Sequence, residues 1–369
     1  MKILHIISGN QINGAATYCK LLCERLVQSG HELFMMVRSE CWLKDVVPDS
    51  ISIVECELQR SIPELRMAAD WIRANQIDVI HTHMTRAHSF GVLLKKLTGV
   101  PVIATAHNRS FQLHWRLNDY VIANSEATRR YHVRRNWILK KKIETVYCYS
   151  DLSPFTHITA EQTEQIRSEL NLRGDEVVAG IVGSVDPRKG HSYLFDALPQ
   201  IIEAIPNFMV VVIGPYCSGF QYADRLRAKL DQQGLADHVK WLGVRSDVPA
   251  LMSVFDLLAV PSVEEPLGLV AIEAHAAGTP VVASNVGGLP EIVYDEVNGL
   301  LVPPRDTAQL AEAIIRLGTS PELRQTFGET GQEMVADTFD PVKLTKRVET
   351  IYREVVERKA VGRKWQRAA

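Results

Sequence analysis

The chain has 369 residues, of which 46% are hydrophobic and 23% charged, and its formal net charge at pH 7 is -2. This composition is typical of a folded globular protein and excludes a disordered segment or a general nucleic-acid binder. The length exceeds what one hydrophobic core serves, so two domains are expected.

The first residues, MKILHIIS, run directly into a strand-like segment and lack the features of a secretory signal. No stretch of the sequence reaches the roughly 18 apolar residues of a membrane-spanning helix. Scattered cysteines without CxxC pairs are typical of reduced thiols, so we expect a cytoplasmic protein. Cys19 and Cys23 share a helical face and are expected in the core. The six cysteines are Cys19, Cys23, Cys41, Cys56, Cys148 and Cys217.

Short apolar, β-branched runs alternate with helical or loop segments in the first part of the chain. This alternation predicts a parallel sheet covered on both faces. The polar segment DLSPFTHITAE then reads as a connection between domains, which places a first domain at residues 1–152. The predicted strands lie in KILHIIS, ELFMMVR, ISIVECEL, DVIHTH, VPVIATAH and DYVIANS.

The same rhythm restarts after this connection and predicts a second doubly wound domain over residues 153–344. Its strands are expected in VVAGIVG, FMVVVIG, HVKWLG, DLLAVPS, TPVVASN and NGLLVPP. Doubly wound sheets bind ligands at the carboxyl ends of their strands, so two such edges facing each other predict a site in a cleft between the domains. The end of the chain has the pattern of a long amphipathic helix, whose residues 345–369 are expected to pack on the first domain.

Two glutamates, Glu265 and Glu273, stand eight residues apart in EPLGLVAIEAHAAGTPVV, a segment that is otherwise apolar, small or glycine. A buried carboxylate without a partner is costly. The pair therefore lies either on a solvated edge or against a ligand that offers hydroxyl or cationic groups.

A helix is predicted over residues 269–277, with Pro266 in a first helical turn and Gly278 at the C-terminal cap. Amides at the start of this helix, together with the positive end of its dipole, are suited to bind an anion such as a diphosphate. These amides belong to Leu267, Gly268 and Leu269.

The segment PSVEEPLGLVAIEAHAAGTPVVASNVGGLPEIVYDEVNGLLVPP closely resembles the donor-site signature of the retaining glycosyltransferases of family four. The spacing of the two glutamates, the GLV-x-x-EA-x-A-x-G-x-PVV core and the downstream GG-x-PEIV carry the resemblance. Weaker matches such as DVIHTH, VIATAH and GSVDPRKG extend it over nearly the whole chain. The resemblance implies an α/β protein of two Rossmann-like, doubly wound parallel-sheet domains facing across a cleft, the B-type glycosyltransferase architecture. It assigns acceptor binding to the first domain and nucleotide-sugar binding to the second.

The resemblance also implies that Glu273 accepts hydrogen bonds from the ribose hydroxyls of a nucleotide sugar and that Glu265 contacts hydroxyls of the transferred sugar. Both roles suit a carboxylate, which is purely an acceptor with two oxygens. The alternative is a helix-capping Glu265 and a solvated Glu273. Implied catalytic residues are His107, Glu265, Arg188 and Lys189, and implied donor-binding residues are Gly14, Arg188, Lys189, Val244, Glu265, Leu267, Gly268, Leu269 and Glu273.

The basic pair Arg188 and Lys189 follows a strand that ends in glycine, within GSVDPRKGH. The family commonly has an arginine directly after that glycine, where this chain has Ser184, whereas Lys189 keeps the position of the family's lysine. Arg188 is the candidate replacement, because its guanidinium geometry suits phosphate. As a bare motif the pair favours a surface turn over a phosphate site, and only its position at the end of a strand reverses this preference.

In the first domain, Asn13 and Gly14 fall where the family has a glycine-rich loop that receives sugar and acceptor. His107 ends the strand VIATAH and matches the family's histidine near the transferred sugar, although a lone histidine is more often structural. His81 and His83 share a sheet face, yet no third ligand at metal-site spacing accompanies them, so they are interpreted as structural or cleft-lining. No metal site is expected.

The resemblance implies metal-independent transfer of a sugar from a nucleotide-diphosphate sugar to an acceptor hydroxyl with retention, and no cofactor. Helix amides, Arg188 and Lys189 would stabilise the departing diphosphate. No carboxylate nucleophile is identified, so departure on the front face is the expectation taken from the family. Cell-envelope polysaccharide, lipopolysaccharide or glycolipid synthesis is the expected setting. A sugar-nucleotide epimerase and a non-catalytic relative that binds a nucleotide sugar remain alternatives.

Residues 129–142, RRYHVRRNWILKKK, contain seven arginines and lysines and no acid. A solvated helix and loop would account for this segment. Its interleaved aromatic and apolar residues also fit an anionic membrane surface, where each charge adds about 1 kcal/mol of binding. The expected partners are thus a nucleotide sugar, a saccharide or lipid-linked acceptor and this surface, at the inner face of the cytoplasmic membrane, without nucleic acid.

Overall fold

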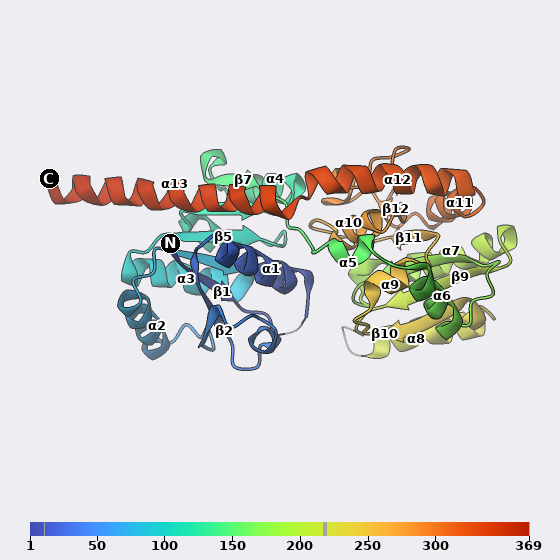
Figure 1. Ribbon diagram of the computed structural model, residues 1–369, viewed down its shortest axis with the longest axis horizontal. Helices are drawn as coiled ribbons and strands as arrows, with labels where there is room; N and C mark the ends of the chain where they lie inside the picture. The colour runs from blue at the N-terminus through green and yellow to red at the C-terminus, as the bar shows by residue number, and fades with distance from the viewer. Residues whose placement is uncertain (11, 217–219, 369) are drawn as a thin grey trace. The chain divides into compact units, whose positions relative to one another are not determined.

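The computed structural model describes residues 1–10, 12–216 and 220–368. Figure 1 shows the chain, which divides into two compact units, Met1–Ser150 with Asp340–Ala369 and Asp151–Phe339. The sequence predicted domain boundaries after residues 152 and 344. In the structure the chain returns to the first unit where its last helix begins.

The first unit is built around a seven-stranded sheet with the order β3-β2-β1-β4-β5-β6-β7, in which all described neighbours pair in parallel. The order reverses between β1 and β4, and this is the switch point of a doubly wound sheet. The strands are β1 Lys2–Ile7, β2 Glu32–Val37, β3 Ile51–Glu55, β4 Val79–His83, β5 Val102–Ala106, β6 Tyr120–Ala123 and β7 Ile143–Thr145.

Helices cover both faces of this first sheet. Alternate residues of β1 point to opposite faces, so Leu4 and Ile6 join the apolar core under α2 and α3, whereas His5 faces the side of α1 and α13. The helices are α1 Gly14–Gln28, α2 Ile62–Ala74, α3 Thr85–Thr98, α4 Glu126–Arg135 and α13 Pro341–Ala368, with short 3-10 turns at η1 Trp42–Asp45, η2 Leu113–Leu117 and η3 Lys140–Lys142.

The second unit contains a six-stranded sheet with the order β10-β9-β8-β11-β12-β13, again parallel throughout. Its order reverses between β8 and β11. The strands are β8 Val177–Val182, β9 Phe208–Ile213, β10 Val239–Gly243, β11 Leu257–Val260, β12 Val281–Ser284 and β13 Gly299–Val302.

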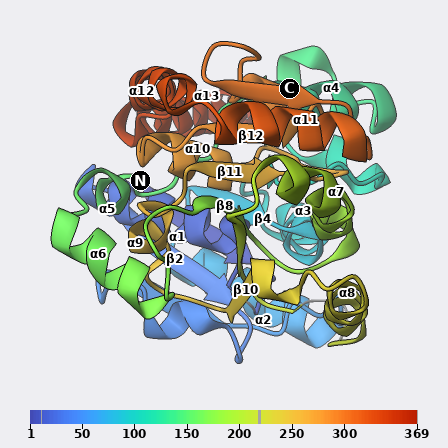
Figure 2. The same ribbon diagram turned by 90° about the vertical axis from the view of Figure 1, so that its right-hand side faces the viewer.

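The helices of the second unit also lie on both sides of its sheet. Figure 2 shows α7 and α8 on one side of β8 and α9 on the other. The core on the α7 side includes Phe195 and Phe208, which are fully buried. The helices are α5 Ser153–Thr156, α6 Ala160–Glu169, α7 His191–Ala204, α8 Phe220–Gln232, α9 Val248–Met252, α10 Leu269–Ala276, α11 Thr307–Gly318 and α12 Pro321–Thr338, with η4 Pro187–Lys189, η5 Ala236–His238 and η6 Leu289–Glu291.

The predicted fold class is confirmed, because each predicted apolar run contains a strand of the structure. The strand β7 was not predicted, since three residues are too few to form a recognisable run. The segment expected to connect the domains begins at the change of unit after Ser150, and it contains α5 and the start of α6.

Five cysteines are free and buried, as expected of reduced thiols, while Cys217 lies outside the described residues. Cys19 and Cys23 are fully buried on α1, in agreement with their predicted place in the core. Among the helices that the structure describes, none combines the length and the apolar character needed to cross a membrane.

Candidate functional site

The carboxyl ends of β8 and β11 lie side by side at the switch point of the second sheet. The loop after β8 runs through η4 to Gly190, and the loop after β11 runs from Pro261 to Gly268. Most of the predicted donor-binding residues belong to these two loops. Ligands of doubly wound sheets bind at such a point, which makes the two loops the candidate site of this unit.

Gly190 allows the backbones of the two loops to approach each other closely. Its φ of 76° is in the left-handed region, and a Cβ atom built on it would lie 1.9 Å from the carbonyl oxygen of Pro261. Only glycine fits both conditions without displacing the backbone. A backbone hydrogen bond of 2.8 Å from Val263 N to the carbonyl oxygen of Arg188 joins the loops a second time.

Lys189 and Glu265 form an ion pair between the loops, with Lys189 Nζ 2.6 Å from Glu265 Oε2. The Lys189 side chain is 26% exposed and the Glu265 side chain 10% exposed. Ser262 Oγ also donates to Glu265 Oε2, over 3.4 Å. The buried carboxylate of Glu265 therefore has the cationic partner that its burial requires.

Arg188 does not join this pair. Its guanidinium lies 3.3 Å from the carboxylate of Asp186 and its side chain is 68% exposed. Ser184 Oγ donates to the same carboxylate over 2.7 Å. Burial by itself would raise the pKa of Asp186, but the hydrogen bonds from Ser184 and from the backbone and side chain of Arg188 outweigh it and lower the pKa.

The helix α10 begins at Leu269, as predicted, and no side chain in the described part of the chain caps its N-terminus. Gly268 precedes it with a φ of 107°, and a Cβ there would lie 2.7 Å from Leu289 Cδ2 and 3.5 Å from Glu265 Cγ. Pro266 lies before the helix, so its predicted place in the first turn was wrong. The loop before the helix packs against Gly288, where a Cβ atom would lie 2.7 Å from Leu267 Cα.

Glu273 lies on α10 itself, one helical turn after Leu269, and is half-buried. Val244 follows β10, two strands away from β8, and its side chain is 68% exposed. The structure thus brings Lys189, Glu265 and the start of α10 together and places Val244 farther along the same edge of the sheet.

The remaining predicted residues belong to the first unit. Asn13 caps α1 by accepting a hydrogen bond of 3.1 Å from Ala16 N, and Gly14 is the first residue of that helix. His107 directly follows β5 and is half-buried. Both positions lie at the carboxyl edge of the first sheet, because α1 follows β1.

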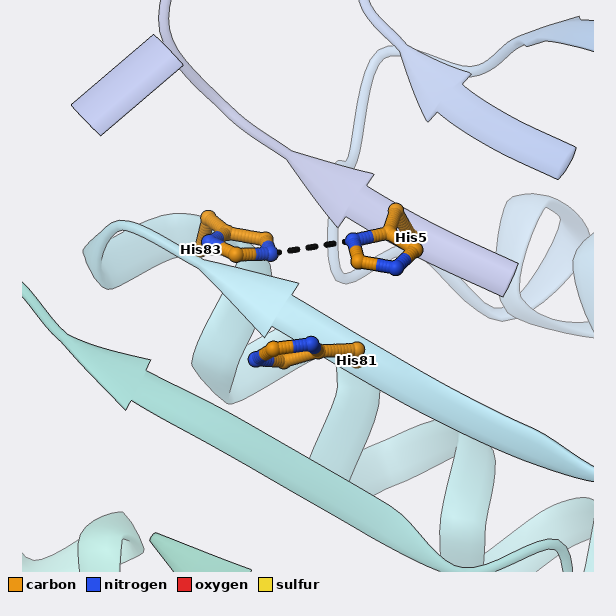
Figure 3. A group of neighbouring side chains, drawn as sticks. All are labelled: His5, His81 and His83. Atoms are coloured by element: carbon orange, nitrogen blue, oxygen red, sulfur yellow. Dashed lines mark hydrogen bonds between the residues drawn. The ribbon is translucent and has the colours of Figure 1, made fainter. Parts of the chain in front are cut away.

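Three buried histidines on the first sheet were not grouped by the sequence. Figure 3 shows His5 beside His81 and His83, and one ring nitrogen from each lies within 4.8 Å of the others. In parallel pairing His5 is the register partner of His81, a relation that spacing along the chain does not reveal. A second group of potential metal ligands combines His5 with Cys19 and Cys23.

Hydrogen bonds account for the three imidazoles without a metal ion. The two nitrogens of His81 lie 2.5 Å from the Tyr352 hydroxyl and 2.7 Å from Thr105 Oγ1. The ring of His81 also lies against that of His83, with centroids 4.3 Å apart and the planes tilted by 37°. The interpretation of these histidines as structural therefore stays the prediction that the geometry favours.

A lysine, two carboxylates and an uncapped helix start give the second unit complementary binding groups. The ammonium and the amides of the first helical turn favour an anion, whereas the carboxylates accept hydrogen bonds from hydroxyls. The site can thus bind a ligand with a phosphate group and neighbouring alcohols.

Two family models match this sequence. The model of glycosyltransferase family 4 matches residues 12–153, and the model of group 1 glycosyl transferases matches residues 162–334. A D-inositol 3-phosphate glycosyltransferase of Saccharomonospora viridis is 30% identical in an alignment that covers 76% of this chain and 70% of that protein. The chain belongs to the family 4 glycosyltransferases. The predicted family is confirmed, and membership favours a glycosyltransferase over the epimerase that the sequence left open.

Two solved structures share the fold of this family 4 glycosyltransferase. HepE of Anabaena, solved with UDP-glucose, matches with a TM-score of 0.87 at 24% identity, and the match covers 96% of this chain and 100% of the HepE chain. Sucrose-phosphate synthase of Thermosynechococcus elongatus matches with a TM-score of 0.81 at 26% identity and covers 96% and 99% of the two chains. These matches agree with the B-type architecture of two Rossmann-like domains.

Proposed function

We propose that this glycosyltransferase moves a sugar from a nucleoside-diphosphate sugar to an acceptor hydroxyl with retention of the anomeric configuration. The observation that carries the proposal is the Lys189–Glu265 ion pair of 2.6 Å at the switch point of the second sheet, beside the uncapped start of α10. This arrangement brings together a cation, a carboxylate that accepts hydrogen bonds from hydroxyls, and the backbone amides at the start of a helix.

In this proposal the diphosphate of the donor lies against the start of α10 and the Lys189 ammonium. Sugar transfer develops negative charge on the departing diphosphate, and preorganised donors stabilise that charge most where water is excluded. Lys189 would exchange part of its contact with Glu265 for the phosphate. Glu265 then accepts hydrogen bonds from the hydroxyls of the transferred sugar.

Glu273 is proposed to bind the ribose. Its place one turn into α10 sets it apart from the diphosphate at the helix start, and a carboxylate accepts both hydrogen bonds of a vicinal diol. Val244, exposed at the end of β10, is proposed as an apolar contact for the donor. Gly268 and the neighbouring Leu267 and Leu269 contribute backbone amides.

The proposed roles of Arg188 and His107 differ in their support. Arg188 is exposed and paired with Asp186, so it reaches phosphate only by leaving that carboxylate. His107 is proposed to contact the transferred sugar, and Gly14 the donor, as the family resemblance implies. Metal independence is part of the proposal, because Lys189 and the helix amides supply positive charge where some transferases use a cation.

Product stereochemistry tests the proposal. The enzyme would be incubated with α-linked UDP-, GDP- and ADP-sugars and a set of acceptors, and the anomeric proton of the product followed by NMR. We expect an α-linked product, formed equally well in the presence of EDTA. An inverted product would contradict retention, and an abolished reaction in EDTA would contradict metal independence. No turnover of any bound donor would favour the non-catalytic relative.

We further propose that the acceptor is presented at an anionic membrane surface, as a lipid-linked saccharide, through the surface built around residues 129–142. Asn136 organises this surface, since its side chain accepts from Gln112 N over 2.8 Å and donates to the carbonyl oxygen of Ser110 over 2.9 Å. This brings Phe111 and Trp137 into ring contact, with centroids 5.8 Å apart.

The exposed apolar side chains of this region come from two segments of the chain. They are Phe111, Leu113, Leu117, Trp137 and Leu139. Basic residues flank them on α4 and η3, although Arg129 and Arg130 are paired with Glu126. Exposed aromatic and aliphatic groups rimmed by lysine and arginine fit the boundary of an anionic bilayer. An inositol phosphate, as the name of the S. viridis relative suggests, is the competing acceptor.

A further inference from the structure

Hydrogen bonds join buried polar side chains of the first unit end to end, starting at His107. Cys148 Sγ lies 3.8 Å from His107 Nδ1, and His107 Nε2 lies 3.1 Å from His83 Nδ1. His83 Nε2 in turn lies 3.1 Å from His5 Nδ1, and Figure 3 shows the nitrogens of these two rings pointing toward each other.

The series continues to the last helix of the chain. His5 Nε2 lies 3.4 Å from the hydroxyl of Tyr352, which belongs to α13. That hydroxyl lies 2.5 Å from His81 Nδ1, and His81 Nε2 lies 2.7 Å from Thr105 Oγ1. We call the series Cys148, His107, His83, His5, Tyr352, His81 and Thr105 the imidazole chain.

The imidazole chain has one direction. Where two rings meet, the Nε2 of one ring faces the Nδ1 of the next. The Tyr352 hydroxyl lies between the Nε2 of His5 and the Nδ1 of His81, so the order of the nitrogens is the same along the whole series. A neutral imidazole has one N–H and one lone pair. When all the rings are neutral, a donor must face an acceptor at every junction, so only two arrangements satisfy the series: every ring has its proton on Nε2, or every ring has it on Nδ1.

Burial keeps three of the four rings neutral and most of the imidazole chain dry. His5, His81, His83 and Tyr352 have no exposed surface. Burial lowers the pKa of His81 and His83 well below the usual value and that of His107 to about 3. At neutral pH these three rings therefore have one proton each, and water cannot replace a mismatched partner at the members that have no exposed surface.

A ligand can reach the imidazole chain at His107. It is half-buried, whereas the other members are buried. Among the residues that the structure describes, the partner of its Nδ1 is the thiol of Cys148 at 3.8 Å, and a thiol is a weak donor and acceptor. A hydroxyl of a ligand can thus replace this contact, whereas Nε2 stays bound to His83.

We propose that the imidazole chain fixes the tautomer of His107, so that His83, His5 and Tyr352 decide whether His107 Nδ1 offers a lone pair or an N–H to a sugar hydroxyl. These three are positioning residues, since they act through His107. The proposal rests on the proposed function only in taking a sugar hydroxyl as the partner of His107. It also links that partner to α13, because Tyr352 closes the series between His5 and His81.

The tautomers can be measured directly on the full-length protein without any ligand. Long-range proton–nitrogen NMR of the chain labelled with ¹⁵N-histidine distinguishes an Nε2–H from an Nδ1–H ring, with signals assigned from single His→Gln variants. We expect His5, His81, His83 and His107 to share one tautomer. A mixed set among these four rings would overturn the proposal, whatever the protein's activity.

Tyr352→Phe then tests whether the series acts on His107. The matched control is Tyr149→Phe, which removes another buried hydroxyl bonded to α13, at 2.7 Å from Thr345 Oγ1, outside the imidazole chain. We expect Tyr352→Phe to shift the His107 ring nitrogens and to weaken binding of a nucleotide sugar about fivefold, the size of one lost hydrogen bond, with binding of the nucleoside diphosphate unchanged. Tyr149→Phe should leave all three unchanged.

The proposal would be overturned if the ring-nitrogen shifts of His107 were unchanged in Tyr352→Phe, or if they changed equally in Tyr149→Phe. Should Tyr352→Phe fail to fold, the tautomers of the unsubstituted protein decide by themselves. A shared tautomer in a protein that binds no nucleoside diphosphate would support the imidazole chain while removing the proposed function, so the two can fail separately.

Discussion

Lys189 and Glu265 form an ion pair of 2.6 Å across a separation of 76 residues in the chain. Each residue stands in the loop that follows one of the two strands at the switch point, so the pair exists because β8 and β11 are neighbours in the sheet. The proposed phosphate contact and the proposed sugar contact are therefore coupled before any donor binds. Removing either one changes the charge that surrounds the other.

This coupling predicts a non-additive double-mutant cycle. Lys189→Ala leaves the Glu265 carboxylate buried without its cation, so its cost should shrink when Glu265→Gln is also present. We expect an interaction free energy of about 1–3 kcal/mol from urea unfolding of the four proteins. The exposed pair Lys229 and Asp196 is the control and should give less than about 1 kcal/mol. Additive values at Lys189 and Glu265 would show that the pair does not form in solution.

Lys189→Ala is also expected to slow sugar transfer about 100-fold, which corresponds to roughly 3 kcal/mol of barrier for one preorganised donor. The rate of nucleoside diphosphate release from the donor sugar measures it. Lys229→Ala serves as the control for loss of a lysine. A rate within about twofold of the unsubstituted enzyme would exclude Lys189 from the phosphate role.

Gly268→Ala tests the packing at the start of α10. Its φ of 107° and the 2.7 Å approach of a built Cβ to Leu289 Cδ2 add backbone strain to crowding. We expect the free energy of unfolding to fall by about 3 kcal/mol, against about 1 kcal/mol for Gly234→Ala, where φ is 70° and no described residue beyond its chain neighbours has an atom within 4 Å of the built Cβ. Equal losses in chemical denaturation would mean that crowding at Gly268 contributes nothing.

The sequence predicted the strands well because buried parallel strands are continuous apolar runs, whose bounds polar residues and glycines mark. It also predicted the start of α10 at Leu269. It could not predict that Glu265 pairs with Lys189, since that contact depends on strand order. The position of His5 beside His81 was missed for the same reason, because it follows from the register of β1 and β4.

The basic segment shows a different limit of sequence reading. The apolar residues within residues 129–142 were considered as part of a membrane surface, beside the alternative of a solvated helix and loop, but Ile138 is buried in the core of the first unit while Trp137 and Leu139 are exposed. The second apolar element of this surface, around Phe111, lies some 26 residues earlier and is joined to it through Asn136. No helical or strand periodicity connects the two.

The proposed membrane surface predicts binding to anionic vesicles. Trp137→Ser with Leu139→Ser should weaken binding to vesicles that contain phosphatidylglycerol by about tenfold or more, because both side chains lose their apolar burial in the bilayer. The buried Ile138 is left intact, so the fold should be kept. Vesicle flotation at low salt measures the effect, with vesicles of phosphatidylcholine as the control. Unchanged binding to anionic vesicles would remove this surface from the account.

Buried histidines predict a loss of stability in mild acid. Burial lowers the pKa of His191 and His275 to about 4, so between pH 6.5 and 4 the unfolded chain binds protons that the folded chain does not. Stability must therefore fall as pH falls through this range, by about 1 kcal/mol for each of these residues between pH 7 and 5.5. Urea unfolding at several pH values should show a shallower slope for His275→Leu than for the exposed control His157→Leu. Identical slopes would contradict the assignment of His275 as a buried neutral ring.

The most direct measurement is a calorimetric titration of the full-length protein with UDP, GDP and ADP, repeated with Glu273→Gln and with the control Glu312→Gln on the exposed side of α11. We predict that at least one nucleoside diphosphate binds, and that Glu273→Gln weakens it about 10-fold or more, since a hydrogen bond to a charged group contributes about 1.5–3 kcal/mol. Glu312→Gln should change nothing. Binding of no nucleoside diphosphate, or binding that Glu273→Gln leaves intact, would contradict the site proposed at the switch point of the second sheet.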